Sequence, residues 1–235
     1  MDEVRIGILK HLADFLTLLN DNARKEYLSK LDEFLKVDNK RNWRFRQELT
    51  EQLCMVVPLY QADDIKEYIA PIALSLIKDK VSEVRHVAAR LIVILLKTLC
   101  SSEDSNLTQA IVTNLIESLA KSSHWAMRQM FVVLSGKVLA ALSNEVIIEV
   151  FLSHLLDLAT DVVSNVRLKV AQILSRILQE EFHSISLSSK CKLIRQALRN
   201  LASDKDKDVR EIVCQAEMLV VDPSVIEANV EEIRS

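Results

Sequence analysis

The sequence predicts an all-α solenoid, a superhelical stack of helical hairpins, on the basis of its composition and an internal repeat. Of the 235 residues 49% are apolar but only 5% are aromatic, and the chain contains 2 glycines and 3 prolines. Folds rich in strands need glycines at their turns and show alternating apolar and polar residues. This chain has neither feature, so we expect helices throughout.

The repeat is marked by arginines that follow an apolar residue at nearly regular intervals. Four of them stand in Val–Arg pairs, and the other two follow Phe45 and Met127. These repeat arginines, separated by 41, 39, 43, 39 and 43 residues, are Arg5, Arg46, Arg85, Arg128, Arg167 and Arg210. A helical repeat with a period near 40 residues is typical of stacked hairpins of the HEAT or armadillo type.

Each hairpin is predicted to have an A helix before the arginine and a B helix after it. Apolar residues spaced three and four apart predict B helices at 6–19, 86–99 and 168–178. The predicted A helices are 23–36, 64–78, 106–120, 144–159 and 189–202. Pro71 lies inside the second A helix and should bend that helix, because proline lacks a backbone donor.

We expect residues 1–235 to form a single HEAT-repeat segment of about five hairpins. The chain starts on a B helix, and residues 223–235 have the pattern of a further A helix. The ends of a solenoid need polar caps, and neither end has one. The segment is therefore expected to be part of a longer solenoid.

Three repeats have an aspartate six residues before the repeat arginine, at Asp79, Asp161 and Asp204. Such a side chain can cap the start of a B helix, or it can accept a bidentate bond from an arginine one repeat away. The other two positions hold Lys40 and Ser122. We predict a structural ladder in which Arg85, Arg167 and Arg210 pair with carboxylates that include these aspartates.

Several functions find no support in the sequence. The net charge of −3 provides no footprint for nucleic acid or an anionic membrane surface, and no apolar run is long enough to span a membrane. The chain has no Gly-rich phosphate loop, nucleophile motif or closely spaced histidine pair, so we expect no enzyme, metal or cofactor. The four cysteines are far apart, which indicates a reduced, cytoplasmic protein that could also enter the nucleus.

Both tryptophans, Trp43 and Trp125, stand three residues before a repeat arginine. This places them in the loops between A and B helices, which form an exposed row that we call the hairpin-loop ridge. Tryptophan is enriched among residues that anchor protein partners. The alternative is that each indole folds over the end of its hairpin as a local plug.

The ridge residues resemble those of a known family. Asn42 to Arg46 is similar to the W-R-x-R loop of the HEAT-repeat scaffold subunits of protein phosphatase 2A-like phosphatases, and Asp161 to Ala171 resembles a D-x-x-x-N-V-R-x-x-V-A loop near the end of those scaffolds. Glu3 to Ala13, together with Asn42 to Arg46, is most similar to the protein phosphatase 4 branch. The order and spacing of the intervening loops also agree, so the resemblance covers nearly the whole chain.

The resemblance implies a regulatory scaffold whose ridge binds a serine/threonine phosphatase catalytic subunit, of the protein phosphatase 4 type, and presents it to phosphorylated substrate proteins. The family's contacts map to Trp43 and Arg44, and an aromatic contact in the next loop is replaced here by Ser82. The full set of candidate partner-binding residues is Trp43, Arg44, Ser82, Glu83, His124, Trp125, Ser164 and Asn165. The alternative is a HEAT adaptor of another class, such as a transport receptor that holds cargo on its concave B-helix face. Exposed apolar anchors on the ridge or on that face would distinguish the two.

Overall fold

The computed structural model describes residues 2–37, 41–100, 105–142, 145–181 and 189–219. The described residues contain helices and no strands, as predicted. Residues 223–235, which we expected to contribute to a further A helix, lie outside them.

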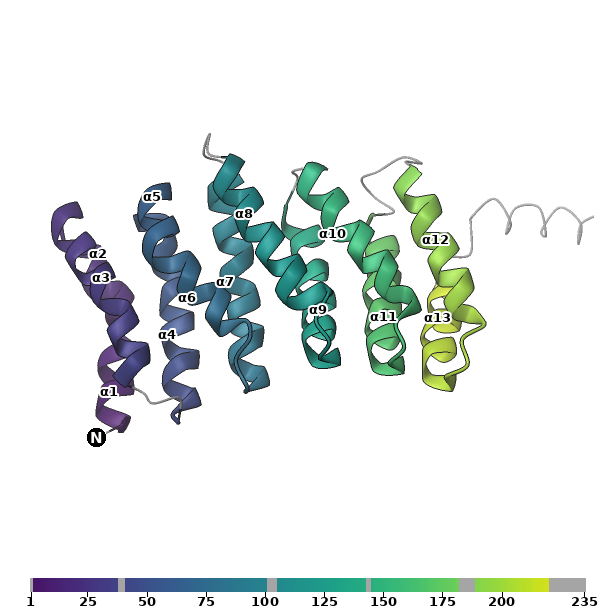
Figure 1. The fold of residues 1–235 in the computed structure, drawn as a ribbon, viewed down its shortest axis with the longest axis horizontal. Coiled ribbons are helices and arrows are strands. Elements are labelled where there is room, and N and C mark those ends of the chain that lie inside the picture. The colour runs from purple at the N-terminus through teal and green to yellow at the C-terminus, as the bar shows by residue number, and fades with distance from the viewer. Residues whose placement is uncertain (1, 38–40, 101–104, 143–144, 182–188, 220–235) are drawn as a thin grey trace, which may run out of the picture.

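The helices form two layers that run along the molecule (Figure 1). The B layer contains α1 (Asp2–Leu9), α2 (Leu12–Thr17), α4 (Trp43–Val56), α7 (Ser82–Cys100), α9 (Trp125–Ala141), α11 (Ser164–Glu181) and α13 (Lys207–Leu219). The A layer contains α3 (Asp21–Val37), α5 (Ala62–Asp64), η2 (Ile65–Ile69), α6 (Ala70–Leu76), α8 (Ser105–Leu115), η3 (Ile116–Ala120), α10 (Glu145–Asp157), η4 (Leu158–Thr160) and α12 (Ser189–Ala202). A short 3₁₀ turn, η1 (Val57–Leu59), follows α4. Because successive hairpins pack side by side, the loops between A and B helices line the lower edge of Figure 1.

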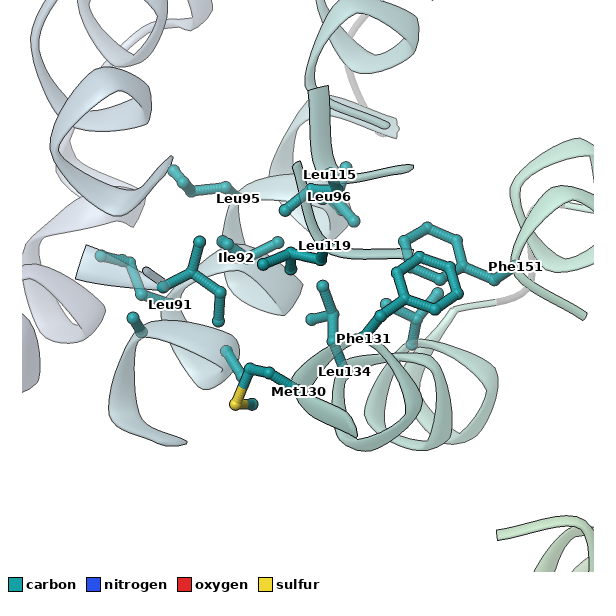
Figure 2. Close-up of a cluster of buried hydrophobic side chains, with 14 of the residues drawn as sticks. Leu91, Ile92, Leu95, Leu96, Leu115, Leu119, Met130, Phe131, Leu134 and Phe151 are labelled. Atoms are coloured by element: carbon teal, nitrogen blue, oxygen red, sulfur yellow. The ribbon is translucent and has the colours of Figure 1, made fainter. Parts of the chain in front are cut away.

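The core is continuous along the stack and consists mainly of leucine, isoleucine, valine and alanine. Figure 2 shows its centre, where Ile92 and Leu96 of α7 lie beside Leu119 of η3 and Leu115 of α8. Phe131 of α9 and Phe151 of α10 are both fully buried, and their rings stack with centroids 5.4 Å apart. This pair supplies one of the few aromatic contacts in a core that is otherwise aliphatic.

The first B helix was predicted as one segment over residues 6–19, and this is wrong. It is divided into α1 and α2 by a break at Lys10 and His11. The buried side chain of Gln52, from α4, accepts a hydrogen bond from the Ala13 amide at 3.0 Å and donates one to the Lys10 carbonyl at 3.1 Å. Two backbone groups at the break, the Ala13 amide and the Lys10 carbonyl, are therefore satisfied by a neighbouring repeat.

Pro71 stands in the first turn of α6, directly after the π-helical turn η2. A proline in an isolated helix would leave a carbonyl unpaired in the preceding turn. The wider π turn changes the hydrogen-bond pattern at that point, which is a common local adjustment in bent helices. A second π-helical turn, η3, closes the next A helix without a proline.

Gly136 marks the closest approach of α9 to α11. A Cβ atom at this position would stand 2.8 Å from Ile173 Cδ1 and 3.0 Å from Arg176 Nη2. These distances are shorter than ordinary van der Waals contact, so the glycine permits the two B helices to pack this closely.

Candidate partner-binding ridge

The candidate partner-binding residues lie in the first turns of four successive B helices, or directly before one in the case of His124, along the same edge of the molecule (Figure 1). We expected the B helices to follow the repeat arginines, but α4, α7, α9, α11 and α13 each begin three residues before one. The two tryptophans are therefore the first residues of α4 and α9 and do not belong to loops. The ridge accordingly consists of helix N-termini together with the loops that precede them.

Trp43 combines features of an anchor and of a plug. Asn42 caps α4 by accepting a hydrogen bond from the Phe45 amide at 3.1 Å, which fixes the start of the helix. The Trp43 ring is half-buried and packs against the core. The exposed Arg44 guanidinium lies over this ring, 4.6 Å from its centroid, in a cation–π arrangement. The pair presents a flat, positively charged surface at the ridge.

Trp125 is more exposed than Trp43, with 45% of its surface accessible. Val162, in the next loop, is 83% exposed. Val162 was not among the residues predicted from the sequence, although its position directly after the ladder aspartate Asp161 was a signal that could have identified it. Exposed apolar groups on successive hairpins are typical of protein interaction sites.

The remaining candidates differ in their surroundings. Glu83, His124 and Asn165 are exposed, whereas Ser82 and Ser164 are half-buried. The Ser82 hydroxyl lies 3.3 Å from His86 Nδ1 within α7. The Asn165 carbonyl accepts a hydrogen bond from Gln129 Nε2 of the preceding repeat at 3.3 Å. The structure thus places all eight residues on one edge, where the side chains of Trp43 and Arg44 stack on each other.

Beside the ridge, arginines and aspartates of successive repeats form a ladder. Arg46 donates to Asp79 at 2.6 and 3.1 Å, and Arg128 donates to Asp161 at 2.5 and 2.9 Å. Arg167 donates to Asp204 at 2.7 and 2.8 Å. Each pair is bidentate, which is the strongest geometry for a guanidinium and a carboxylate. Each pair also joins one hairpin to the next.

The ladder aspartates also hold the loops that precede the B helices. The carboxylate of Asp79 accepts a hydrogen bond from the Val81 amide at 2.8 Å, and Asp161 does the same for Val163. These bonds lie in the loop before the helix. The aspartates therefore do not cap the B helices, which was one of the two roles that the sequence allowed. The arginine of the same repeat donates to the aspartate's own carbonyl, as Arg167 does to Asp161 at 2.7 Å.

The predicted ladder needs correction, because each aspartate pairs with the arginine of the preceding repeat. Arg46 and Arg128 pair with carboxylates, and we had not named either of them. Arg85 has no carboxylate partner among the described residues and donates to the carbonyls of Asp79 and Lys80 at 2.8 and 3.0 Å. Arg210 donates to the Asp204 carbonyl at 2.6 Å. The prediction that an arginine of this set pairs with a named aspartate holds for Arg167 and Asp204.

The ladder changes the acid–base behaviour of its members. Burial alone would raise the pKa of Asp79 and Asp161, but hydrogen bonds from Arg46 and Arg128 and from backbone amides outweigh it and lower both pKa values. The hydrogen bond from Arg167 lowers the pKa of Asp204 against the opposing effect of burial. The ladder carboxylates are therefore ionised at neutral pH despite their burial.

The described residues contain no group of three or more side chains arranged to hold a metal ion. Within the same part of the chain, no helix has the length and apolar character to cross a membrane. The four cysteines are all unpaired, with Cys54 buried and Cys214 exposed.

These features define an α-solenoid of HEAT-type hairpins with an internal Arg–Asp ladder and a ridge of exposed aromatic and apolar side chains. No family model matches the chain. It is 40% identical over 213 residues to serine/threonine-protein phosphatase 4 regulatory subunit 1 of Mus musculus, and 39% identical to that of Homo sapiens. Each match covers 89% of this chain and 22% of the relative, so the chain spans about a fifth of the length of the curated relatives it matches. The chain is thus a homologue of one segment of these HEAT-repeat regulatory subunits.

Comparison with solved structures finds partial similarity to two proteins. An engineered protein has a TM-score of 0.44 and 17% identity, with 88% of this chain and 94% of that chain covered. Importin beta has a TM-score of 0.43 and 15% identity, with 92% of this chain and 33% of importin beta covered.

Proposed function

We propose that this chain is a non-catalytic segment of a phosphatase regulatory scaffold. Its hairpin-loop ridge binds a serine/threonine phosphatase catalytic subunit of the protein phosphatase 4 type and presents it to phosphorylated substrate proteins. The observation that carries this proposal is the 40% identity, over 89% of the chain, to proteins named as protein phosphatase 4 regulatory subunits.

The distribution of exposed apolar groups supports the ridge as the binding surface. Trp125 and Val162 are exposed there, and the Trp43–Arg44 pair lies on the same edge. Tryptophan and arginine are enriched among residues that dominate binding energy, so these side chains are the proposed anchors.

Cargo binding on the B-helix face is the alternative function, and a few exposed apolar residues favour it. Met55, near the other end of α4 from Trp43, is 54% exposed, and Val4, Ile8 and Phe15 of α1 and α2 are also exposed. These side chains lie only on the first helices of the B layer, however, whereas the ridge presents anchors on several successive hairpins. The ridge is therefore the better supported surface.

The test measures the affinity of the purified chain for a purified protein phosphatase 4 catalytic subunit by biolayer interferometry. Arg44→Ala and Trp125→Ala should each weaken binding about thirtyfold, because truncating an anchor costs roughly 2 kcal/mol. Both side chains are exposed, so helicity measured by circular dichroism should not change. Trp43→Ala with Arg44→Ala should abolish detectable binding.

Met55→Ala is the matched control, since it truncates an exposed apolar side chain of the same helix away from the ridge. It should bind like the unmodified chain. Full-strength binding by folded Arg44→Ala and Trp125→Ala variants would show that the ridge is not the binding surface. Loss of binding in Met55→Ala alone would favour the alternative.

A further inference from the structure

Among the described residues, the ladder has a gap between the hairpins that contain α7 and α9. Each ladder arginine meets an aspartate 33 or 37 residues further along the chain. For Arg85 the corresponding position, six residues before Arg128, is Ser122. The guanidinium is present in this repeat but the carboxylate is not.

Arg85 otherwise has the surroundings of a ladder arginine. Its Nη1 group donates to the two carbonyls of its own loop, at Asp79 and Lys80, as that of Arg128 does at Ser122 and Ser123. Its Nε atom is buried and has no hydrogen-bond partner among the described residues. In the three complete pairs this same nitrogen donates to the aspartate at 2.5–2.7 Å. A buried donor of a charged group without a partner is costly, so Arg85 is prepared for an anion.

The backbone and the side chain of Ser122 both make the hydrogen bonds that a ladder aspartate makes within its loop. Its carbonyl accepts a hydrogen bond from Arg128 at 2.9 Å, which is the bond that the Asp161 carbonyl accepts from Arg167. Its hydroxyl accepts a hydrogen bond from the amide two residues on, at His124, as the Asp161 carboxylate does from Val163. Ser122 therefore performs the loop function of the aspartate but lacks its charge.

We propose that Ser122 is a phosphorylation site and that its phosphate completes the ladder by pairing with Arg85. In this step a protein kinase transfers the γ-phosphoryl group of a nucleoside triphosphate. The Ser122 Oγ–P bond forms, the bond from the γ-phosphorus to the leaving nucleoside diphosphate breaks, and the hydroxyl proton is released. The phosphoserine carries close to two negative charges at neutral pH and three strong acceptor oxygens, which suit a guanidinium.

The position of the gap favours a group attached to Ser122 over a carboxylate supplied by a partner. The aspartates of the complete pairs have side chains only 4–10% exposed, so the missing anion belongs inside the ridge. An acidic side chain from a docked protein would have to enter this interior, whereas a phosphate on Ser122 is already held there. A kinase can still approach, because the neighbours Lys121, Ser123 and His124 are exposed and Ser122 itself is half-buried.

Phosphorylation of Ser122 would connect the hairpins that contain α7 and α9, which no ladder pair joins. The complete pairs join α4 to the loop before α7, α9 to the loop before α11, and α11 to the loop before α13. A phosphate on Ser122 would add the missing link between α7 and the loop before α9. The modification would therefore stiffen the stack at a step that no ladder pair joins.

The pairing is tested by placing phosphoserine at position 122 of the full chain through an expanded genetic code. The midpoint of thermal unfolding should rise by about 2–4 °C, as expected for a new charge-assisted pair in a chain of this size. The Arg85 Nε–H resonance in an NMR spectrum should move downfield. Phosphoserine at Ser123, which is exposed in the same loop, is the matched control and should change neither quantity. Arg85→Gln should remove the gain.

The modification itself is tested by mapping phosphorylation on the full-length protein isolated from its own cells with phosphatase inhibitors present. Phosphate on Ser122 is expected, and its absence would overturn the assignment of the modification. Equal stabilisation by phosphoserine at 122 and 123, or a gain that survives Arg85→Gln, would overturn the pairing. A shift of the Arg85 resonance in the unmodified chain only on addition of the catalytic subunit would assign the gap to a partner carboxylate instead.

Discussion

At the scale of single residues, each ladder aspartate has three structural roles. The Asp161 carboxylate pairs with Arg128 and accepts a hydrogen bond from the Val163 amide. The Asp161 backbone carbonyl accepts a hydrogen bond from Arg167. One residue therefore fixes the loop geometry and joins two hairpins. Its burial is tolerated because the oxygens are satisfied, and removal of any one partner would leave a buried polar group without compensation.

The lowered pKa of Asp161 predicts how Asp161→Asn changes the pH dependence of stability. Because the folded-state pKa lies below the ordinary value of 3.8, the ionised carboxylate stabilises the folded chain. This contribution is complete above about pH 5 and is lost as the pH falls through 3.8 towards the folded-state pKa. In urea unfolding, the variant should be less stable than the unmodified chain at pH 6, and the difference should shrink towards pH 3.

Asp157→Asn is the control for this measurement, because Asp157 is exposed on the neighbouring helix α10. The unfolding free energy of Asp157→Asn should stay close to that of the unmodified chain from pH 6 to pH 3. A stability difference for Asp161→Asn that stays constant between pH 6 and pH 3 would contradict the role of the charge.

At the scale of helices, the apolar pattern predicted the A helices within two residues of their observed bounds. It placed the starts of the B helices too late, although the first turns of α7, α11 and α13 each contain a buried valine, at Val84, Val166 and Val209. The repeat arginine lies inside the first full turn and reaches back to loop carbonyls, as Arg85 does to Asp79 and Lys80. The repeat arginine is therefore not the boundary between the loop and the B helix, although its recurrence in the sequence suggested that it was.

The division of the first B helix could not be predicted from its own residues. The break depends on Gln52, which lies 39 residues beyond Ala13 in the sequence. The partner of each ladder arginine could not be predicted for the same reason, because it lies 33 or 37 residues away. The sequence showed which residues recur but not which repeats they join. The candidate ridge was predicted more fully, because the position of a residue relative to its repeat arginine determines the edge on which it lies.

Gln52→Leu should destabilise the junction of α1 and α2. The substitution preserves the size of the side chain but leaves the Ala13 amide and the Lys10 carbonyl without their partner, which costs roughly 1–3 kcal/mol for a buried group. The unfolding free energy should fall by that amount, and the Ala13 amide should exchange its hydrogen faster in NMR measurements. Gln47→Leu, which removes only a bond to Glu51 within the same helix, should have a much smaller effect. Unchanged exchange at Ala13 would show that Gln52 does not hold the break.

At the scale of the whole molecule, stability in a stack of hairpins depends on each hairpin and on its contacts with the next. The core in Figure 2 is continuous across these boundaries and is mostly aliphatic, so it does not by itself specify how far each hairpin rotates relative to its neighbour. The bidentate pairs have directional geometry and lie at the ridge, where they fix the spacing of successive loops. The ladder therefore fixes the proposed binding residues of α4 relative to those of α7, and those of α9 relative to those of α11.

Arg167→Ala should destabilise the stack far more than the loss of an exposed ion pair. The Arg167 and Asp204 side chains are 5% and 8% exposed, so the substitution leaves a buried carboxylate without its partner. Breaking such a pair costs roughly 3–5 kcal/mol. Lys121→Ala, which removes an exposed pair with Glu117, should cost less than about 1 kcal/mol. Hydrogen exchange should show loss of protection in α11 and α13, on either side of the broken pair, before α4 and α7. If Arg167→Ala and Lys121→Ala lower the unfolding free energy equally, or if protection is lost evenly along the chain, the ladder does not couple neighbouring hairpins.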